Sequence, residues 1–131
     1  SPQGPGEPFF IEESYATLAA PLLGITGSED RQQAAPPENR RRGFDLWPPG
    51  DKFFVWLEGA EHSAFSDATG AGRRMLPSDA REDVQPLVRA ATLLFFNGFL
   101  KQDPGARAAL AADGLRPYRR GATPAIEVLH K

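Results

Sequence analysis

The sequence predicts an α/β fold with a parallel sheet. Two short apolar runs, LLGIT at residues 22–26 and KFFVWLE at 52–58, have the length and the flanking turn residues of buried strands. The second run is apolar on both faces, as in a strand that is covered on both sides of its sheet. Helical patterns at 36–47 and 79–100 alternate with these runs, and such alternation is typical of α/β domains.

Composition and charge narrow the class of protein. The chain has 131 residues, about the length of one small domain, and its 40% hydrophobic and 24% charged residues suit a globular protein. A net charge of −2 gives no basic surface for nucleic acid, and no apolar run approaches the ~18–20 residues of a membrane span. The chain has no cysteine, which excludes disulfides and a cysteine nucleophile and fits a reducing or an oxidising compartment equally.

The first strand is preceded by a segment rich in proline and glycine. Residues 1–10, which open with SPQGPG, lack the basic start and apolar core of a signal peptide, so we expect a loop that follows an earlier element. A short helical turn is expected at 11–19. The first strand then begins after Pro21 and is closed by Gly27, and residues 27–35 are expected to form a polar loop.

The helix expected between the strands spans residues 36–47. It has proline near its first turn and stops at Pro48-Pro49-Gly50. Its arginines, Arg40–Arg42, are expected on a solvated helix face, and contact with a substrate carboxylate is the alternative. After the second strand, residues 59–80 are expected to form a loop that contains several glycines.

The clearest helix spans about residues 79–100, where apolar residues recur with the i, i+3, i+4, i+7 spacing of a buried face. These residues are Val84, Leu87, Val88, Ala91, Leu94 or Phe95, and Phe99. Ser78 or Asp79 can cap this helix, and a start of its regular part at Pro86 is the alternative.

Two shorter elements complete the chain. Asp103 and Pro104 predict a helix that has Asp as its cap and ends near Gly114, and PAIEVLHK at 124–131 predicts a terminal edge strand. Only two central strands are visible, and two parallel strands cannot form an independently stable sheet. We therefore expect the chain to fold against another polypeptide, or to be the latter part of a larger domain.

An acid and a histidine follow the two strands at the point where each strand ends. Asp30 lies in ITGSEDR at 25–31, and His62 lies in LEGAEHSAF at 57–65. Sites in open α/β sheets collect outside the carboxyl ends of the strands, and the intervening chain is long enough for a helical crossover. We expect the two side chains to face each other, because a general-base histidine needs a carboxylate at Nδ1.

These segments resemble the last third of an α/β-hydrolase of the dienelactone-hydrolase-like or platelet-activating-factor-acetylhydrolase-like serine esterases. ITGSEDR resembles their acid loop in its G-x-x-D form, and PPGDKFFVWLEGAEHSAF resembles their final strand and histidine loop. SPQGPG resembles the loop after the strand that precedes the acid, and the long helix resembles their closing helix.

The resemblance implies that residues 1–131 form the C-terminal segment of a single α/β-hydrolase domain. That segment holds the last parallel strands with their packing helices, and its fold is incomplete without the N-terminal part. The implied activity is hydrolysis of small-molecule carboxylic esters by a Ser-His-Asp triad, with Asp30 as the acid, His62 as the base and no cofactor. Gln3 and Phe65 are expected to line the substrate site.

The serine of such a triad is not found in this sequence. The nucleophile elbow G-x-S-x-G is absent, and none of the serines stands in such an elbow. We expect the N-terminal part of the same hydrolase, joined or as a second chain, to carry the elbow and the oxyanion hole, and the chain alone to be inactive. The alternative is a non-catalytic subunit or interaction fragment that completes a partner's sheet.

Several residues also have simpler interpretations. Asp30 is a common turn former, and Glu29 is the fallback for the acid. His130 and Glu61 are expected to be exposed, and the two histidines are too few for a metal site. The two tryptophans are expected in the core.

Overall fold

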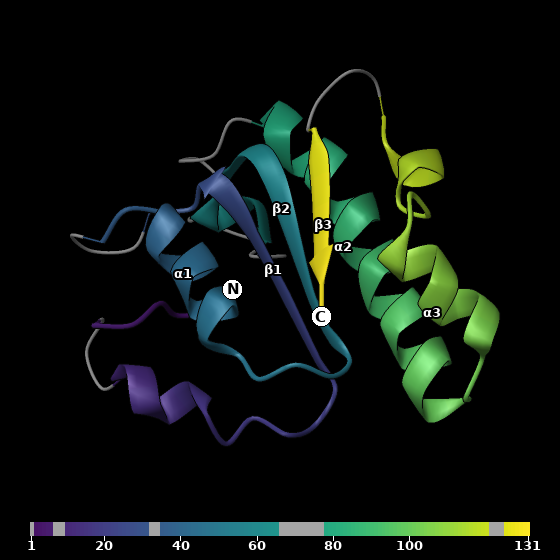
Figure 1. Ribbon diagram of the computed structural model, residues 1–131. Helices are drawn as coiled ribbons and strands as arrows, with labels where there is room; N and C mark the ends of the chain where they lie inside the picture. The colour runs from purple at the N-terminus through teal and green to yellow at the C-terminus, as the bar shows by residue number, and fades with distance from the viewer. Residues whose placement is uncertain (1, 7–9, 32–34, 66–77, 121–124) are drawn as a thin grey trace.

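The computed structural model describes residues 2–6, 10–31, 35–65, 78–120 and 125–131 (Figure 1). The elements in chain order are η1 (Glu12–Tyr15), β1 (Leu22–Glu29), α1 (Glu38–Leu46), β2 (Lys52–Glu61), η2 (His62–Phe65), α2 (Ser78–Leu100), α3 (Pro104–Ala111), η4 (Arg116–Tyr118) and β3 (Ile126–His130). The side chains of Ser78 and Asp79, the expected caps of the long helix, lie outside the described part of the structure. Residues 66–77, most of the loop expected at 59–80, also lie outside it.

The strands form one mixed sheet in the order β1-β2-β3. β1 and β2 run parallel, which confirms the expected parallel pair, and β3 adds an antiparallel strand along the other edge of β2. Figure 1 shows α1 on one side of the sheet and α2 with α3 on the other. The α/β arrangement and the terminal edge strand are therefore confirmed.

β2 is the centre of the molecule, and its side chains alternate between two cores. Phe53, Val55 and Leu57 point into the core that α2 and α3 complete. Phe54 and Trp56 point into a second core on the side of α1 and η1, where Tyr15, Phe44 and Trp47 meet them. A strand with a neighbour on each edge and a hydrophobic layer on each face leaves no room for polar alternation, which explains its apolar sequence.

The long helix α2 buries the face that its sequence predicts. Val84, Leu87 and Ala91 are buried in the core with β2, while Val88, Leu94, Phe95 and Phe99 pack around it half-buried. α3 then packs along α2, and its N-terminus is capped as expected, since Asp103 Oδ1 accepts hydrogen bonds from the backbone N–H of Gly105 and Ala106 at 2.8 and 3.2 Å.

The alternative start of α2 at Pro86 is wrong, because the helix begins at Ser78 and contains Pro86 in its interior. Proline at this position removes the hydrogen bond to the carbonyl of Glu82. Glu82 is exposed, so water can satisfy that carbonyl. Within the described part of the chain, no helix combines the length and the apolar character that a bilayer span requires.

Both strands of the parallel pair are longer than the sequence predicts. β1 does not end at Gly27 but continues to Glu29, because the missing side chain of Gly27 lets the two strands approach closely. A Cβ at this position would lie 2.0 Å from the carbonyl oxygen of Ala60. β2 continues to Glu61 through Gly59, whose φ of 78° suits glycine, so the expected loop begins only after Glu61.

Helix α1 is tied to the terminal strand by an ion pair. The Arg41 guanidinium donates two hydrogen bonds to the Glu127 carboxylate, Nη1 to Oε2 at 2.7 Å and Nη2 to Oε1 at 2.8 Å. Arg42 Nη2 also donates to the Glu12 carboxylate of η1. Both arginines are at least partly exposed, as the sequence predicts for the helix face, but each also links α1 to a neighbouring element.

The pair with Arg41 should make stability depend on pH. The hydrogen bond from Arg41 lowers the pKa of Glu127 below its ordinary value of 4.5. The pair therefore stabilises the fold above that ordinary value, and this contribution is lost as the pH falls through the lowered pKa. We expect Glu127→Gln to reduce the free energy of unfolding by about 0.2–1 kcal/mol near neutral pH, the range of partly exposed pairs.

Urea unfolding at about pH 7 and about pH 3 measures this difference. At the acid pH, below the ordinary pKa of 4.5, the difference between the variant and the native chain should be smaller. Glu58→Gln, at an exposed position on β2, is the matched control and should change stability little at either pH. A loss in Glu127→Gln that persists undiminished at about pH 3 would contradict the ion-pair explanation.

Candidate active site

Asp30 lies in the turn that ends β1, and that turn folds its side chain back onto the strand. The N–H of Asp30 donates to the carbonyl of Gly27 at 3.1 Å, and that of Arg31 donates to the carbonyl of Glu29 at 2.8 Å. The Thr26 hydroxyl, four residues earlier in β1, donates to Asp30 Oδ2 at 2.7 Å. Both Thr26 and Asp30 are fully buried, so the acid is held inside the sheet edge and not in solvent.

His62 is brought to Asp30 by an irregularity in the parallel ladder. Between its pairing with Gly27 and its pairing with Glu29, β2 advances from Leu57 to Glu61, so extra residues of β2 bulge outward. The N–H of Gly59 donates to Ser28 Oγ at 2.8 Å and joins the bulge to the acid turn. The helical turn η2 then begins at His62, directly beside that turn.

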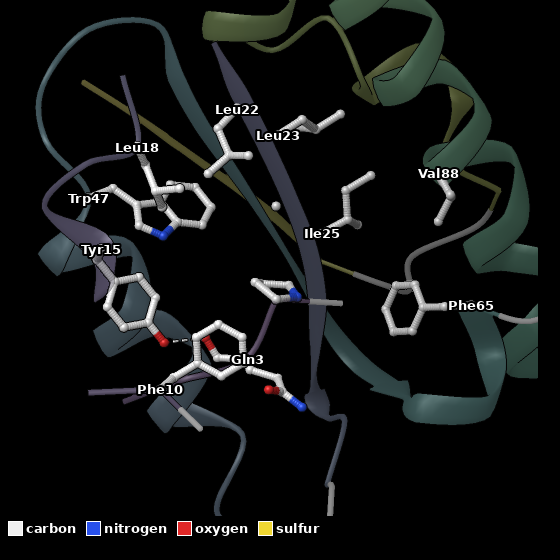
Figure 2. Close-up of a pocket in the computed structure, with 12 residues that line it drawn as sticks. Gln3, Phe10, Tyr15, Leu18, Leu22, Leu23, Ile25, Trp47, Phe65 and Val88 are labelled. Carbon is white, nitrogen blue, oxygen red and sulfur yellow. Dashed lines mark hydrogen bonds between the residues drawn. The ribbon is translucent and has the colours of Figure 1, made fainter. Parts of the chain in front are cut away.

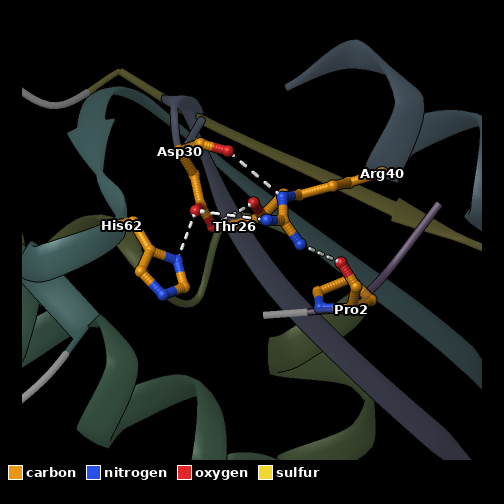
Figure 3. A network of polar contacts seen from close by, with 5 residues as sticks. All are labelled: Pro2, Thr26, Asp30, Arg40 and His62. Atoms are coloured by element: carbon orange, nitrogen blue, oxygen red, sulfur yellow. Dashed lines mark hydrogen bonds and ion pairs between the residues drawn. The ribbon is translucent and has the colours of Figure 1, made fainter. Parts of the chain in front are cut away.

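Asp30 and His62 are in contact, which confirms the expected meeting of the acid and the histidine. Asp30 Oδ1 lies 2.7 Å from His62 Nδ1. The His62 side chain is 56% exposed while Asp30 is 0% exposed, and Figure 3 shows the other ring nitrogen, Nε2, directed away from the carboxylate. A carboxylate that accepts from Nδ1–H leaves Nε2 as a free proton acceptor, which is the arrangement of a general base.

Arg40 departs from the sequence expectation. It is not on the solvated face of α1 but is buried, with a side-chain exposure of 1%. Its Nε donates to the backbone carbonyl of Asp30 at 3.2 Å, and its Nη2 lies 3.6 Å from Asp30 Oδ1. Nη1 donates to the carbonyl of Pro2 (Figure 3). The alternative role, contact with a substrate carboxylate, does not fit a guanidinium that faces an internal carboxylate.

The helical spacing of the sequence indicates a buried position for Arg40. Arg40, Gly43, Phe44 and Trp47 follow the i, i+3, i+4, i+7 spacing of one helix face, and all four are buried. An arginine on that face must enter the core and needs an internal acid as its partner. The sequence indicates Thr26 as a partner of Asp30 less strongly. Thr26 is the polar member of an otherwise apolar run and lies four residues before Asp30.

Glu29, the fallback for the acid, does not face His62. Glu29 points outward, with its carboxylate 3.7 Å from Arg31 Nε and its side chain 51% exposed. Glu61 is exposed, as expected. His130 is also exposed and stacks on Phe53 at a ring distance of 6.2 Å. Asp30 is therefore the acid that faces His62.

Gln3 and Phe65 line one pocket, but that pocket follows the open edge of β1. It has a volume of about 540 Å³. Leu18 and Trp47 form its wall on one face of the sheet, and Phe65 and Val88 form its wall on the other (Figure 2). Walls from both faces can meet only around the edge of a sheet, and β1 is the edge strand here. Asp30 and His62 lie outside this lining.

Neither a serine partner nor a metal centre accompanies the pair in the described part of the chain. The hydroxyls of Ser14 and Ser28 accept hydrogen bonds from the backbone N–H groups of Ile11 and Gly59, respectively, and neither of these bonds involves His62. Among the described residues, no group of histidines and carboxylates has the arrangement of a metal site. Comparison with protein-family models, curated protein sequences and solved structures found no significant match.

The contact with Asp30 should fix the tautomer of His62. A carboxylate only accepts hydrogen bonds, so we expect the neutral form of His62 to carry its proton mainly on Nδ1. Asp30→Asn offers an amide N–H to Nδ1, and we expect the Nε2–H tautomer to become the major form. Side-chain ¹⁵N NMR resolves this change, and His130 serves as the internal reference.

Glu29→Gln is the matched control, because it neutralises the neighbouring acid without touching His62. It should leave the tautomer of His62 unchanged. The same tautomer population for His62 in the native chain and in Asp30→Asn would show that the contact does not orient the ring.

Proposed function

We propose that this chain supplies the acid and the base of a serine hydrolase that cleaves small carboxylic esters, in the manner of an α/β-hydrolase. The observation that carries the proposal is the buried Asp30 carboxylate 2.7 Å from His62 Nδ1, with the rest of the imidazole exposed. Both groups stand at the carboxyl ends of neighbouring parallel strands, where sites of open α/β sheets collect. An acid with this burial and direction has the role that orients a catalytic histidine.

The chemistry follows from these positions. A serine hydroxyl attacks the ester carbonyl, and His62 Nε2 takes the hydroxyl proton. The imidazolium is stabilised by the Asp30 carboxylate and returns the proton to the leaving alcohol, which leaves an acyl-enzyme. Water then attacks the acyl group, gives its proton to the same nitrogen, and releases the carboxylic acid and the free serine.

The serine is proposed to come from a part of the enzyme outside these residues. The sequence has no G-x-S-x-G elbow, and the outer edge of β1 is lined with apolar groups on both faces of the sheet. An added strand parallel to β1 could pair with the outer edge of this strand and cover those apolar walls. We propose that this serine-bearing part contributes the strand, the elbow and the oxyanion hole. The term complete enzyme means this chain together with the serine-bearing part.

Gln3 and Phe65 are proposed as substrate contacts of the complete enzyme. Phe65 ends the helical turn that His62 begins, and it lines the end of the pocket wall on the α2 side. An aromatic ring at this position can pack against the acyl chain of an ester. Gln3 lines the same pocket and carries an amide that can bind a polar group of the substrate.

A second candidate function is an interaction fragment that completes a partner's sheet without catalysis. The open apolar edge of β1 favours it, because a strand could pair there in either case. The two candidates differ in what they require of His62. Catalysis needs the Nε2 atom of His62. Addition of a strand at the edge of β1 does not need His62, because His62 does not line the pocket at that edge.

The ester hydrolase proposal is tested by His62→Ala in the complete enzyme. We expect hydrolysis of a p-nitrophenyl ester of a short fatty acid to fall on the order of 10³-fold or more, because proton transfer to and from the serine is lost. Circular dichroism should show an unchanged fold, since the His62 side chain is largely exposed.

His130→Ala is the matched control, because it removes the chain's other histidine at an exposed site remote from Asp30. It should leave the rate unchanged. Nearly native hydrolysis by His62→Ala would overturn the catalytic assignment and favour the interaction fragment.

A further inference from the structure

We propose that Arg40 is a positioning residue that holds the Asp30 carboxylate against His62. This inference rests on the proposed function only for its catalytic consequence, because the contacts themselves belong to this chain. Arg40 reaches Asp30 from α1, and its side chain is 1% exposed. Arg40 is not among the residues that line the pocket, and two of its contacts are with Asp30, so we place its effect on catalysis at the acid.

A single guanidinium holds both the main chain and the side chain of Asp30. Nε donates to the backbone carbonyl at 3.2 Å, and Nη2 stands 3.6 Å from Oδ1. Because the guanidinium is planar and rigid, these two contacts fix the turn and the direction of the carboxylate together (Figure 3). A lysine ammonium is a point charge and cannot make both contacts with the same geometry.

The charge of Arg40 allows the carboxylate to be buried. Asp30 is 0% exposed, and an isolated carboxylate would be very costly there. Arg40 compensates the negative charge, and the Thr26 hydroxyl occupies Oδ2 at 2.7 Å. Oδ1 is thereby directed to His62 Nδ1. Burial keeps water from competing for that oxygen, which strengthens the contact with the ring.

The first turn of α1 also joins the acid to the loop at residues 2–6. Arg40 Nη1 donates to the carbonyl of Pro2, and Asn39 Nδ2 donates to the carbonyl of Pro5 at 2.8 Å. Gly4 packs so closely on this turn that a Cβ would lie 2.2 Å from the carbonyl oxygen of Asn39. Pro2 and Gln3 line the pocket at the edge of β1, so Arg40 connects that edge to the acid.

The test compares Arg40→Met and Arg40→Lys with the native protein. In this chain, side-chain ¹⁵N NMR of His62 should show a mixture of tautomers in Arg40→Met, with His130 unchanged. In the complete enzyme, kcat should fall about 10- to 100-fold, as for partners that orient a functional group. KM should stay nearly constant, because Arg40 does not touch the substrate. Arg40→Lys should show a smaller change in the tautomer of His62 and a smaller loss of kcat.

Arg41→Met and Arg42→Met are the matched controls, because they remove neighbouring arginines that face Glu127 and Glu12. They should retain the native tautomer and kcat. If Arg40→Met does not fold, Arg40→Lys tests the proposal instead, because it keeps the positive charge beside the buried carboxylate. A native tautomer and a native kcat in the folded Arg40 variant would overturn the proposal.

The outcomes separate this proposal from the proposed function. If no ester is hydrolysed but Arg40→Met still mixes the tautomers of His62, the function fails and the positioning role stands. If His62→Ala abolishes hydrolysis but the Arg40 variants keep the native tautomer and kcat, the function stands and the positioning role fails.

Discussion

A buried carboxylate determines how this chain is built at the carboxyl edge of its sheet. Asp30 has no access to solvent, and such a group is tolerated only when its charge and its oxygens are all compensated. The strand supplies Thr26, α1 supplies Arg40, and the turn after β2 supplies His62. Each of these partners comes from a different element, so the acid ties the two strands and the crossover helix into one unit.

The close approach of the parallel strands is the backbone counterpart of this arrangement. Gly27 faces the carbonyl of Ala60 at a distance that excludes any Cβ. The bulge at Gly59 then displaces β2 outward and starts η2 beside the acid turn. The geometry on which the proposed catalysis depends is therefore set by glycines and by a turn, while the bulky side chains of β2 hold the sheet between two cores.

Much of this architecture could be predicted from the sequence, and the features that could not be predicted have physical causes. Uninterrupted apolar residues revealed β2, and the carboxyl-end rule for parallel strands brought Asp30 to His62. The strand ends were wrong because glycine at 27 and 59 marks close packing and a bulge here rather than a stop. Arg40 was misplaced because charge alone suggested the surface, whereas its helical spacing with Phe44 and Trp47 indicated the core. The pocket at the β1 edge could not be predicted from the sequence, because residues distant in sequence form its two walls.

The most direct measurement for the central claim is covalent labelling of the complete enzyme with a fluorophosphonate, followed by peptide mapping. Such probes react with a serine that a histidine activates. We expect a single adduct on a serine outside residues 1–131, within a G-x-S-x-G elbow. No adduct on an assembly that forms normally would contradict the assignment of Asp30 and His62 to a serine hydrolase, and an adduct on a serine within these residues would contradict the proposal that another part supplies the nucleophile.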